Sequence, residues 1–160
     1  MEPFKMTIHD IHDYQQNRYP FLFMDAVEEV VPGECIKGYK NLTINDWFFK
    51  THFPGRPTMP GVLQVEALIQ IGALTVLTLD GNKGRVVYAT SINNVRFLKE
   101  VIPGDRFDME VILKSWRRGL GICAGKAHVN GELVCMADFT ITIPEILREI
   151  SNQLPGRQTA

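Results

Sequence analysis

A long apolar segment in the middle of the chain limits the folds open to it more than any other feature. Residues 62–79 have the sequence VLQVEALIQIGALTVLTL, which as a helix would extend about 27 Å. Gln64, Glu66 and Gln70 lie near one end, and a charged residue inside a lone membrane span costs roughly 2.5 kcal/mol or more. We therefore expect no membrane insertion but a helix that its own domain covers on nearly every side.

The segments that follow this helix have the pattern of antiparallel strands. Pro60-Gly61 suits the first turn of the helix, and the glycines within 81–84 are typical of its end. One curled sheet wrapped around the helix would bury every apolar face, so the predicted fold class is α+β. The predicted strands, with an Asn-Gly hairpin signal between the last two, are 85–92, 95–98, 107–116, 120–129 and 132–143.

The first 60 residues predict smaller elements around that core. A helix is expected at 8–15, capped by Thr7 or Asp10, and strands at 21–31 and 35–44. The stretch before the long helix, WFFKTHFPGRPTMPG, is too dense in proline and glycine for a regular element. We expect a shaped loop there. After the last strand, one or two helical turns are predicted near the C-terminus.

Composition limits the function without identifying it. At 160 residues the chain is expected to form a single domain over 1–150, with 151–160 as a flexible tail. Its 17 basic and 18 acidic residues give a net charge of −1, which argues against a nucleic-acid binder that relies on bulk charge. Three cysteines without a C-x-x-C pair, and an N-terminus without an apolar leader, favour a reduced cytoplasmic protein.

Two ionisable residues near the helix start are placed in a way that suits acid–base chemistry. His52 lies in the proline-rich loop, where no helix or strand assigns it to a core. Glu66 lies in the second turn of a helix whose other faces are apolar. Because a buried carboxylate without a partner tends to take up a proton, we expect the pKa of Glu66 to be raised. A histidine beside such a carboxyl would form a base and an acid in different environments.

Each of these residues also has a plainer interpretation. A glutamate near a helix start often interacts with the helix dipole, and a histidine in a loop is often only solvated. Their combination favours chemistry, because one loop carries the histidine and then begins the helix that carries the glutamate. The unpaired backbone N–H groups at Gly61 and Val62 would in addition stabilise a negative oxygen.

Four blocks of the sequence resemble a known enzyme family. They are NRYPFLFMD, NLTINDWFFKTHFPGRPTMPGVLQVEALIQ, INNVRFLKEVIPGD and RRGL, in order and at compatible spacing. They resemble the beta-hydroxyacyl-acyl-carrier-protein dehydratases of type II fatty acid synthesis, and the stretch from His52 to Gln70 is the most specific. The resemblance implies the hotdog fold, an antiparallel sheet wrapped around one long central helix.

The resemblance also implies roles for individual residues. His52 matches the family's catalytic histidine, Glu66 its catalytic acid, and Gly61 the glycine whose N–H holds the thioester carbonyl. A glutamate is typical of the general elongation dehydratases, whereas the decanoyl dehydratase-isomerases have aspartate. Members act on acyl carrier protein without a cofactor or metal. They form homodimers that pair the histidine of one subunit with the glutamate of the other, commonly as trimers of dimers.

The implied reaction removes water from a (3R)-3-hydroxyacyl thioester to give a trans-2-enoyl thioester. His52 would take the C2 proton, Gly61 and Val62 would stabilise the enolate-like oxygen, and Glu66 would protonate the departing hydroxyl. Candidate walls of an acyl tunnel, equally well explained as core, are Phe21, Phe23, Met59 and Leu63. Candidates for a basic rim facing the acidic carrier protein, or for an ordinary charged face, are Arg96, Lys99, Lys114, Arg117 and Arg118.

The sequence departs from the family pattern at three places. Asn17 stands where the family usually has histidine, Thr51 where it has glycine, and Leu98-Lys99-Glu100 where a basic residue before proline is common. Together these departures suggest a specialised pathway, such as polyene or secondary-metabolite synthesis. The alternatives are a hotdog acyl thioesterase, a non-catalytic acyl-binding subunit, and an additional isomerisation of the double bond.

Overall fold

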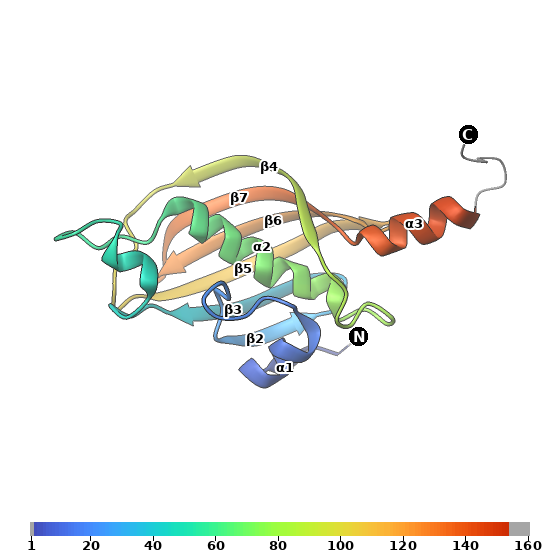
Figure 1. Cartoon of the computed structure of the whole chain (residues 1–160), viewed down its shortest axis with the longest axis horizontal. Coiled ribbons are helices and arrows are strands. Elements are labelled where there is room, and N and C mark those ends of the chain that lie inside the picture. Colours follow the sequence, from blue (N-terminus) through green and yellow to red (C-terminus); the bar gives the residue numbers. More distant parts are fainter. Residues whose placement is uncertain (1, 154–160) are drawn as a thin grey trace.

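One sheet curled around one helix dominates the computed structural model, which describes residues 2–153 (Figure 1). Helix α2, Gly61–Leu77, lies along the concave face of a seven-stranded sheet in which all neighbouring strands are antiparallel. The strand order is β1-β2-β3-β5-β6-β7-β4. This is the hotdog arrangement, and the predicted α+β fold class is confirmed.

The remaining elements follow the predicted order along the chain. The strands are β1 (Phe4–Met6), β2 (Ala26–Val31), β3 (Cys35–Asn41), β4 (Tyr88–Phe97), β5 (Arg106–Arg117), β6 (Leu120–Val129) and β7 (Glu132–Thr142). The helices besides α2 are α1 (Ile8–Tyr14), the 3-10 turn η1 (Trp47–Lys50) and α3 (Pro144–Gln153). The helix α3 extends away from the sheet at one end of the molecule (Figure 1).

Two strand predictions were wrong in detail. The segment 21–31 becomes a strand only at Ala26, because the backbone of Phe21 and Phe23 hydrogen-bonds to the Gln70 side chain of α2. The predicted strands 85–92 and 95–98 are one strand, β4, whose register shifts where Asn94 adopts a φ of 51°. A bulge keeps a strand continuous where the pattern of alternation breaks.

Three further differences concern the ends of elements. The short strand β1 was not predicted, since three residues carry too little alternation to be recognised. The loop before α2 begins with η1, so its first residues are regular after all. The helix α3 continues to Gln153, past the predicted turns at 145–150, whereas residues 154–160 of the predicted tail lie outside the described residues.

Two turns predicted from short sequence motifs are confirmed. The predicted Asn130-Gly131 hairpin joins β6 to β7, with both residues at positive φ and Val129 opposite Glu132. The helix α2 ends at Leu77, and the Asn82 side chain in the glycine-containing turn donates to the carbonyl of Val76 (2.9 Å). That bond satisfies one of the carbonyls left unpaired at a helix C-terminus.

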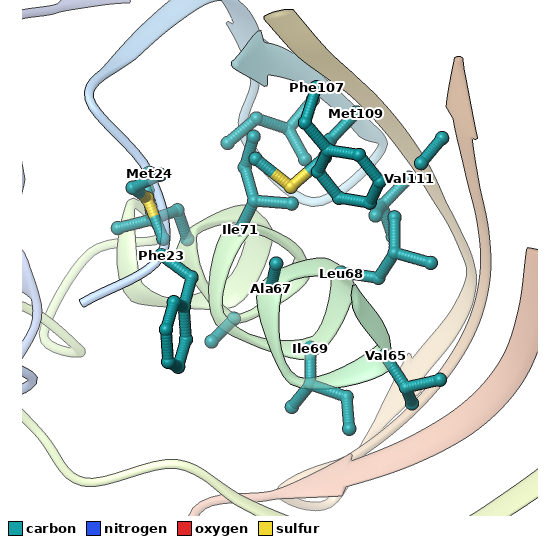
Figure 2. Close-up of a cluster of buried hydrophobic side chains, with 14 of the residues drawn as sticks. Phe23, Met24, Val65, Ala67, Leu68, Ile69, Ile71, Phe107, Met109 and Val111 are labelled. Atoms are coloured by element: carbon teal, nitrogen blue, oxygen red, sulfur yellow. The ribbon is translucent and has the colours of Figure 1, made fainter. Parts of the chain in front are cut away.

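The core is the contact between α2 and the concave face of the sheet. From Leu63 to Leu77, every residue of α2 except Glu66 is buried. Figure 2 shows Leu68 and Ile71 directed toward Phe107, Met109 and Val111 of β5. A helix that is apolar nearly all round is stable only when covered in this way. Among the described residues, none of the helices is both long enough and apolar enough to cross a membrane.

The helix α2 packs closely against a glycine of β3, Gly38. A Cβ atom on Gly38 would lie 2.4 Å from the carbonyl oxygen of Ala26 and 2.8 Å from Cδ1 of Ile71. The first neighbour is backbone of the adjacent strand, which cannot rotate away. Any side chain at this position would therefore force β2, β3 and α2 apart.

We predict that Gly38→Ala lowers the free energy of unfolding by about 3 kcal/mol, because overpacking here must displace backbone. The measurement is urea unfolding at fixed protein concentration. Gly81→Ala is the matched control: its φ is 80° and nothing lies within 4 Å of its Cβ position. The control has only left-handed backbone strain, about 1 kcal/mol. Equal losses in the two variants would contradict the packing argument.

Candidate active site

His52 is held in one orientation by the loop that follows η1. Its backbone N–H donates to the carbonyl of Phe48 (3.0 Å), and its carbonyl accepts from the N–H of Thr58 (2.8 Å). The ring atom Nδ1 lies 2.8 Å from the carbonyl oxygen of Thr58. Because a carbonyl oxygen only accepts, this contact assigns the proton to Nδ1 and leaves a lone pair on Nε2. The half-buried imidazole is thus oriented as a base.

The loop itself is shaped by backbone hydrogen bonds, in agreement with the prediction. Phe53 and Arg56 exchange two of them, at 3.1 and 3.0 Å, and the N–H of Met59 donates to the carbonyl of Val101 (2.8 Å). Thr51, which replaces the glycine usual in the family, has φ −116° and ψ −21°. These angles are open to any residue, so the position does not require glycine in this chain.

Glu66 is the one half-buried carboxyl on the otherwise buried part of α2. Its burial removes water from the carboxylate and raises its pKa, while a hydrogen bond from Gln70 acts in the opposite direction. The raised pKa predicted from the sequence is confirmed in direction. A carboxyl of this kind holds its proton at a higher pH than an exposed glutamate and can donate it to a leaving group.

Gln70 is a site residue that the sequence analysis did not identify. Its Nε2 donates to Oε1 of Glu66 (2.8 Å) and to the carbonyl of Phe21 (3.0 Å), and its Oε1 accepts from the N–H of Phe23 (2.9 Å). One buried amide therefore orients the carboxyl and fixes the segment that precedes β2. The spacing of four residues puts both side chains on one face of the helix, a signal that the sequence did contain.

The N-terminus of α2 presents backbone N–H groups that no side-chain cap occupies. Pro60 is the N-cap residue and makes no side-chain hydrogen bond, and the first N–H groups of a helix, here those of Gly61 and Val62, have no intrahelical partner. The ring of Phe97 covers Gly61, where a Cβ would lie 2.7 Å from Cζ of Phe97. These N–H groups and the helix dipole favour a negatively charged oxygen.

His52 and Glu66 line two different recesses of the chain. The His52 recess has a volume of about 620 Å³, and the Glu66 recess about 370 Å³. No described residue lines both. The His52 recess includes Met59, Gly61, Val62, Phe97 and Lys99. The Glu66 recess is bounded by residues 15–17, by residues 85–89 and by Ile69, Gln70, Ala73 and Leu77 of α2. The two groups needed for acid–base chemistry are therefore separated within one chain.

The four residues considered for the tunnel have different surroundings. Met59 lines the His52 recess. Phe23 and Leu63 are buried in the hydrophobic core, whereas Phe21 is 44% exposed and packs edge-on against Phe23. Of these four, none lines the Glu66 recess.

The basic residues considered for a rim are divided between the two ends of the sheet. Lys99 lines the His52 recess and is paired with Glu132, and Arg96 lies on β4 beside it. Arg117 and Arg118 lie at the opposite end. Strand pairing establishes this, because Leu120 lies opposite Arg117 and Thr142, and Thr142 lies opposite Tyr88, the first residue of β4.

Lys114 has a different environment from the other four basic residues. It lies on β5 and is paired with Asp138 of β7 at 3.1 Å. Neither Lys114 nor Asp138 lines the His52 recess. Among residues 2–153, no group of three or more His, Cys, Asp and Glu side chains is arranged to hold a metal ion.

Comparison with known proteins gives consistent matches over most of the chain. A FabA-like domain family model matches residues 16–138. The 3-hydroxyacyl-[acyl-carrier-protein] dehydratase FabZ of Bacillus velezensis is 47% identical over 81% of this chain and 92% of its own. The enzyme of the same name from Clostridium tetani is 46% identical over 86% and 97%. The dehydratase heterocomplex ApeI:P from Xenorhabdus doucetiae shares the fold, with a TM-score of 0.70 at 14% identity over 89% and 97% of the two chains.

We predict that Glu66→Gln is more stable than the wild type at neutral pH. Burial raises the pKa of Glu66 in the folded state above its ordinary value of 4.5. As the pH rises past that value, the unfolded state loses its proton first, so the wild type loses stability until the folded carboxyl has also ionised. The variant has no such loss and keeps an acceptor for Gln70.

The measurement is urea unfolding of both proteins across this pH range at one protein concentration. The stability difference should be smallest in acid and grow as the pH increases. The exposed Glu34 provides the control, because Glu34→Gln makes the same chemical change at the surface. A difference between wild type and Glu66→Gln that does not change with pH would contradict the prediction.

Proposed function

This chain belongs to the FabA-like domain family, and on that basis we propose that it is a 3-hydroxyacyl-[acyl-carrier-protein] dehydratase. It removes water from a (3R)-3-hydroxyacyl group carried on acyl carrier protein and releases the trans-2-enoyl thioester. The two FabZ enzymes compared above are named for this activity and align with most of the chain.

The observation that carries the catalytic part of the proposal is the contrast between two proton-transfer groups. His52 has its Nδ1 proton engaged by Thr58, which leaves Nε2 as an acceptor. Glu66 has a raised pKa and is oriented by Gln70, so it is suited to hold a proton. A pair of groups that differ in this way fits a reaction in which one proton is removed and another supplied.

The reaction proceeds by loss of the elements of water from C2 and C3. Nε2 of His52 takes the C2 proton, and the electron pair moves onto the thioester carbonyl oxygen. The N–H groups of Gly61 and Val62 stabilise that oxygen at the N-terminus of α2. The electron pair then returns to form the C2–C3 double bond as the C3–O bond breaks, and Glu66 protonates the leaving hydroxyl to give water.

The separation of the two recesses favours a site shared between two subunits. The Glu66 recess adjoins the first residues of β4, Tyr88 and Ala89, and the His52 recess adjoins its last residue, Phe97. If two copies of β4 pair in antiparallel fashion, the end of each lies beside the start of the other. Each His52 recess then meets the partner's Glu66 recess, and a two-fold dimer has two complete sites.

The exposure of β4 supports this pairing. It is the last strand of the sheet order, and none of its residues is buried. It nevertheless carries large apolar side chains, including Tyr88, Ile92 and Phe97. A long, exposed edge strand with apolar side chains is normally covered by pairing. We propose a homodimer formed through β4, and, from the family resemblance, a trimer of dimers as the larger assembly.

The acyl chain and the carrier protein occupy opposite sides of the reacting carbons in this arrangement. The apolar side chains of the Glu66 recess receive the acyl chain, with Phe21, Phe23, Met59 and Leu63 as further candidates. The carrier protein, which is acidic in this family, approaches the His52 side, where Lys99 lines the recess and Arg96 precedes the lining residue Phe97 on β4. Lys114, Arg117 and Arg118 are more distant candidates for the same contact.

A cytoplasmic location is part of the proposal. Cys35, Cys123 and Cys135 are free, as expected in a reducing compartment. Burial raises the pKa of Cys123 to about 12 and that of Cys135 to about 11. These thiols are therefore protonated and poorly reactive at neutral pH.

We predict that His52→Ala and Glu66→Gln each abolish hydration of an enoyl thioester, while a mixture of the two variants recovers activity. In a mixed dimer both substitutions fall in one site and the other site is intact. After random exchange of subunits, activity should reach about a quarter of the wild type. The measurement is enoyl hydration before and after the two proteins are unfolded together and refolded.

Two outcomes would contradict parts of this proposal. No recovery, although mass analysis detects mixed dimers, would show that the two residues do not act in one shared site. Release of free thiol and fatty acid without any hydration would instead identify a thioesterase. Gas chromatography of the products also detects any movement of the double bond.

We predict that Ile92→Lys converts the dimer to monomers and removes activity, because it introduces a charge into the β4 edge. Ile92 is 47% exposed. The matched control is Ile112→Lys, since Ile112 is 50% exposed but lies on β5, in the interior of the sheet. Analytical ultracentrifugation should give a monomer for the first variant and the assembly of the wild type for the second. The wild-type assembly in both cases would place the interface elsewhere.

A further inference from the structure

The Glu66 recess follows one face of α2 for most of the helix. Five residues of α2 line it, Glu66, Ile69, Gln70, Ala73 and Leu77, and their spacing of i, i+3, i+4, i+7 and i+11 places them along a single stripe. From Glu66 to Leu77 that stripe extends about 16 Å. A chain that entered beside Glu66 would therefore end near Leu77.

Residues 15–17 form the wall at the Leu77 end. The segment from Tyr14 to Phe23 runs antiparallel to α2. The backbone of Phe23 binds Gln70 within the helix, whereas the carbonyl of Tyr14 accepts from the N–H of Gly84, beyond the end of the helix. The Gln16 side chain also donates to the carbonyl of Gly84 (2.9 Å). Residues 15–17 therefore border the part of the recess most distant from the reacting carbons.

Gln15 is an unusual residue for this position. Gln15 lines the recess and is only 4% exposed. Its Nε2 donates to Oδ1 of Asn17 (2.9 Å), whereas its Oε1 has no hydrogen-bond partner among the residues that the structure describes. Buried side-chain oxygens are almost always paired in native proteins, and an unpaired one destabilises the fold. An unpaired acceptor on a residue that lines a recess fits a hydrogen bond that a bound ligand supplies.

The charge at this end of the recess is already neutralised. Arg85 lines it, but its Nη1 donates to Oε1 of Glu149 on α3 (3.1 Å) and its Nε to the carbonyl of Gly81 (3.0 Å). The Gln15 oxygen would repel a carboxylate, and the Arg85 cation is already paired with Glu149. An ammonium group would meet the Arg85 cation. A neutral donor is the group that this environment accommodates.

We propose that Gln15 determines substrate specificity by accepting a hydrogen bond from a hydroxyl group at the distal end of the acyl chain. The inference rests on the proposed dehydratase function and defines its substrate class: acyl chains that are apolar beside Ile69, Ala73 and Val86 and hydroxylated near Gln15. An unsubstituted chain of the same length leaves the Gln15 oxygen buried and unpaired, so it reacts less well.

The test compares thioesters of equal length with and without a terminal hydroxyl, over a series of lengths. The wild type should prefer the hydroxylated substrate by about tenfold in kcat/KM at the length that spans about 16 Å. In Gln15→Met, which keeps the volume of the side chain but has no amide oxygen, this preference should disappear. The ratio of kcat/KM for the two substrates is the measured quantity, so a change in overall activity does not affect the comparison.

Leu77→Met is the matched control, since it alters the apolar lining at the same end of the recess. It should change kcat/KM for both substrates by the same factor and leave their ratio as in the wild type. A wild type that acts on plain chains but shows no preference at any length overturns the inference alone, as does a preference that survives in Gln15→Met. A wild type that hydrates no enoyl thioester overturns the dehydratase function, and this inference with it.

Discussion

The burial of α2 within the curled sheet is the constraint on which the rest of the structure depends. A helix with apolar side chains on every face must be covered on every face, and one sheet does this for all residues from Leu63 to Leu77 except Glu66. The exception lies where the sheet ends at β4, and residues 15–17, residues 85–87 and the start of β4 border it there. Glu66 therefore lies where the sheet does not cover α2, and its carboxyl contacts a recess there. The carboxyl is still partly buried, and this burial raises its pKa.

Gln70 connects the stability of the fold to the orientation of the proposed acid. Its amide accepts from the N–H of Phe23 and donates to the carbonyl of Phe21, in a segment that precedes β2. The same amide donates to the carboxyl of Glu66. The alternative partner for those backbone groups would be a neighbouring strand, which this edge of the core does not supply. Because a buried, fully hydrogen-bonded network has one preferred arrangement, the carboxyl is positioned by the same bonds that close the core.

The sequence predicted those features that depend on neighbours along the chain. The α2 helix, the strands β5 to β7, the hairpin at Asn130-Gly131 and the raised pKa of Glu66 all follow from local pattern, and each is confirmed. The strand start at Ala26 and the continuous β4 were predicted wrongly, since both depend on partners distant in sequence. The separation of His52 from Glu66 could not be predicted from residue spacing either, because it depends on which side of α2 each recess opens.

The absence of any buried residue in β4 has a physical explanation in the proposed assembly. A strand at the edge of a sheet presents unpaired N–H and C=O groups, and proteins normally protect such edges with charge, proline or a cover. β4 instead carries Tyr88, Ile92 and Phe97 at its surface, so in isolation it would be prone to association. Antiparallel pairing with a second copy satisfies its backbone and covers these side chains. A two-fold axis makes the two β4 strands antiparallel. The end of β4 near His52 in one subunit therefore lies beside the end near Glu66 in the other. One contact would then stabilise the edge and complete the chemistry, which gives a reason why each chain carries both halves of a site that it does not close by itself.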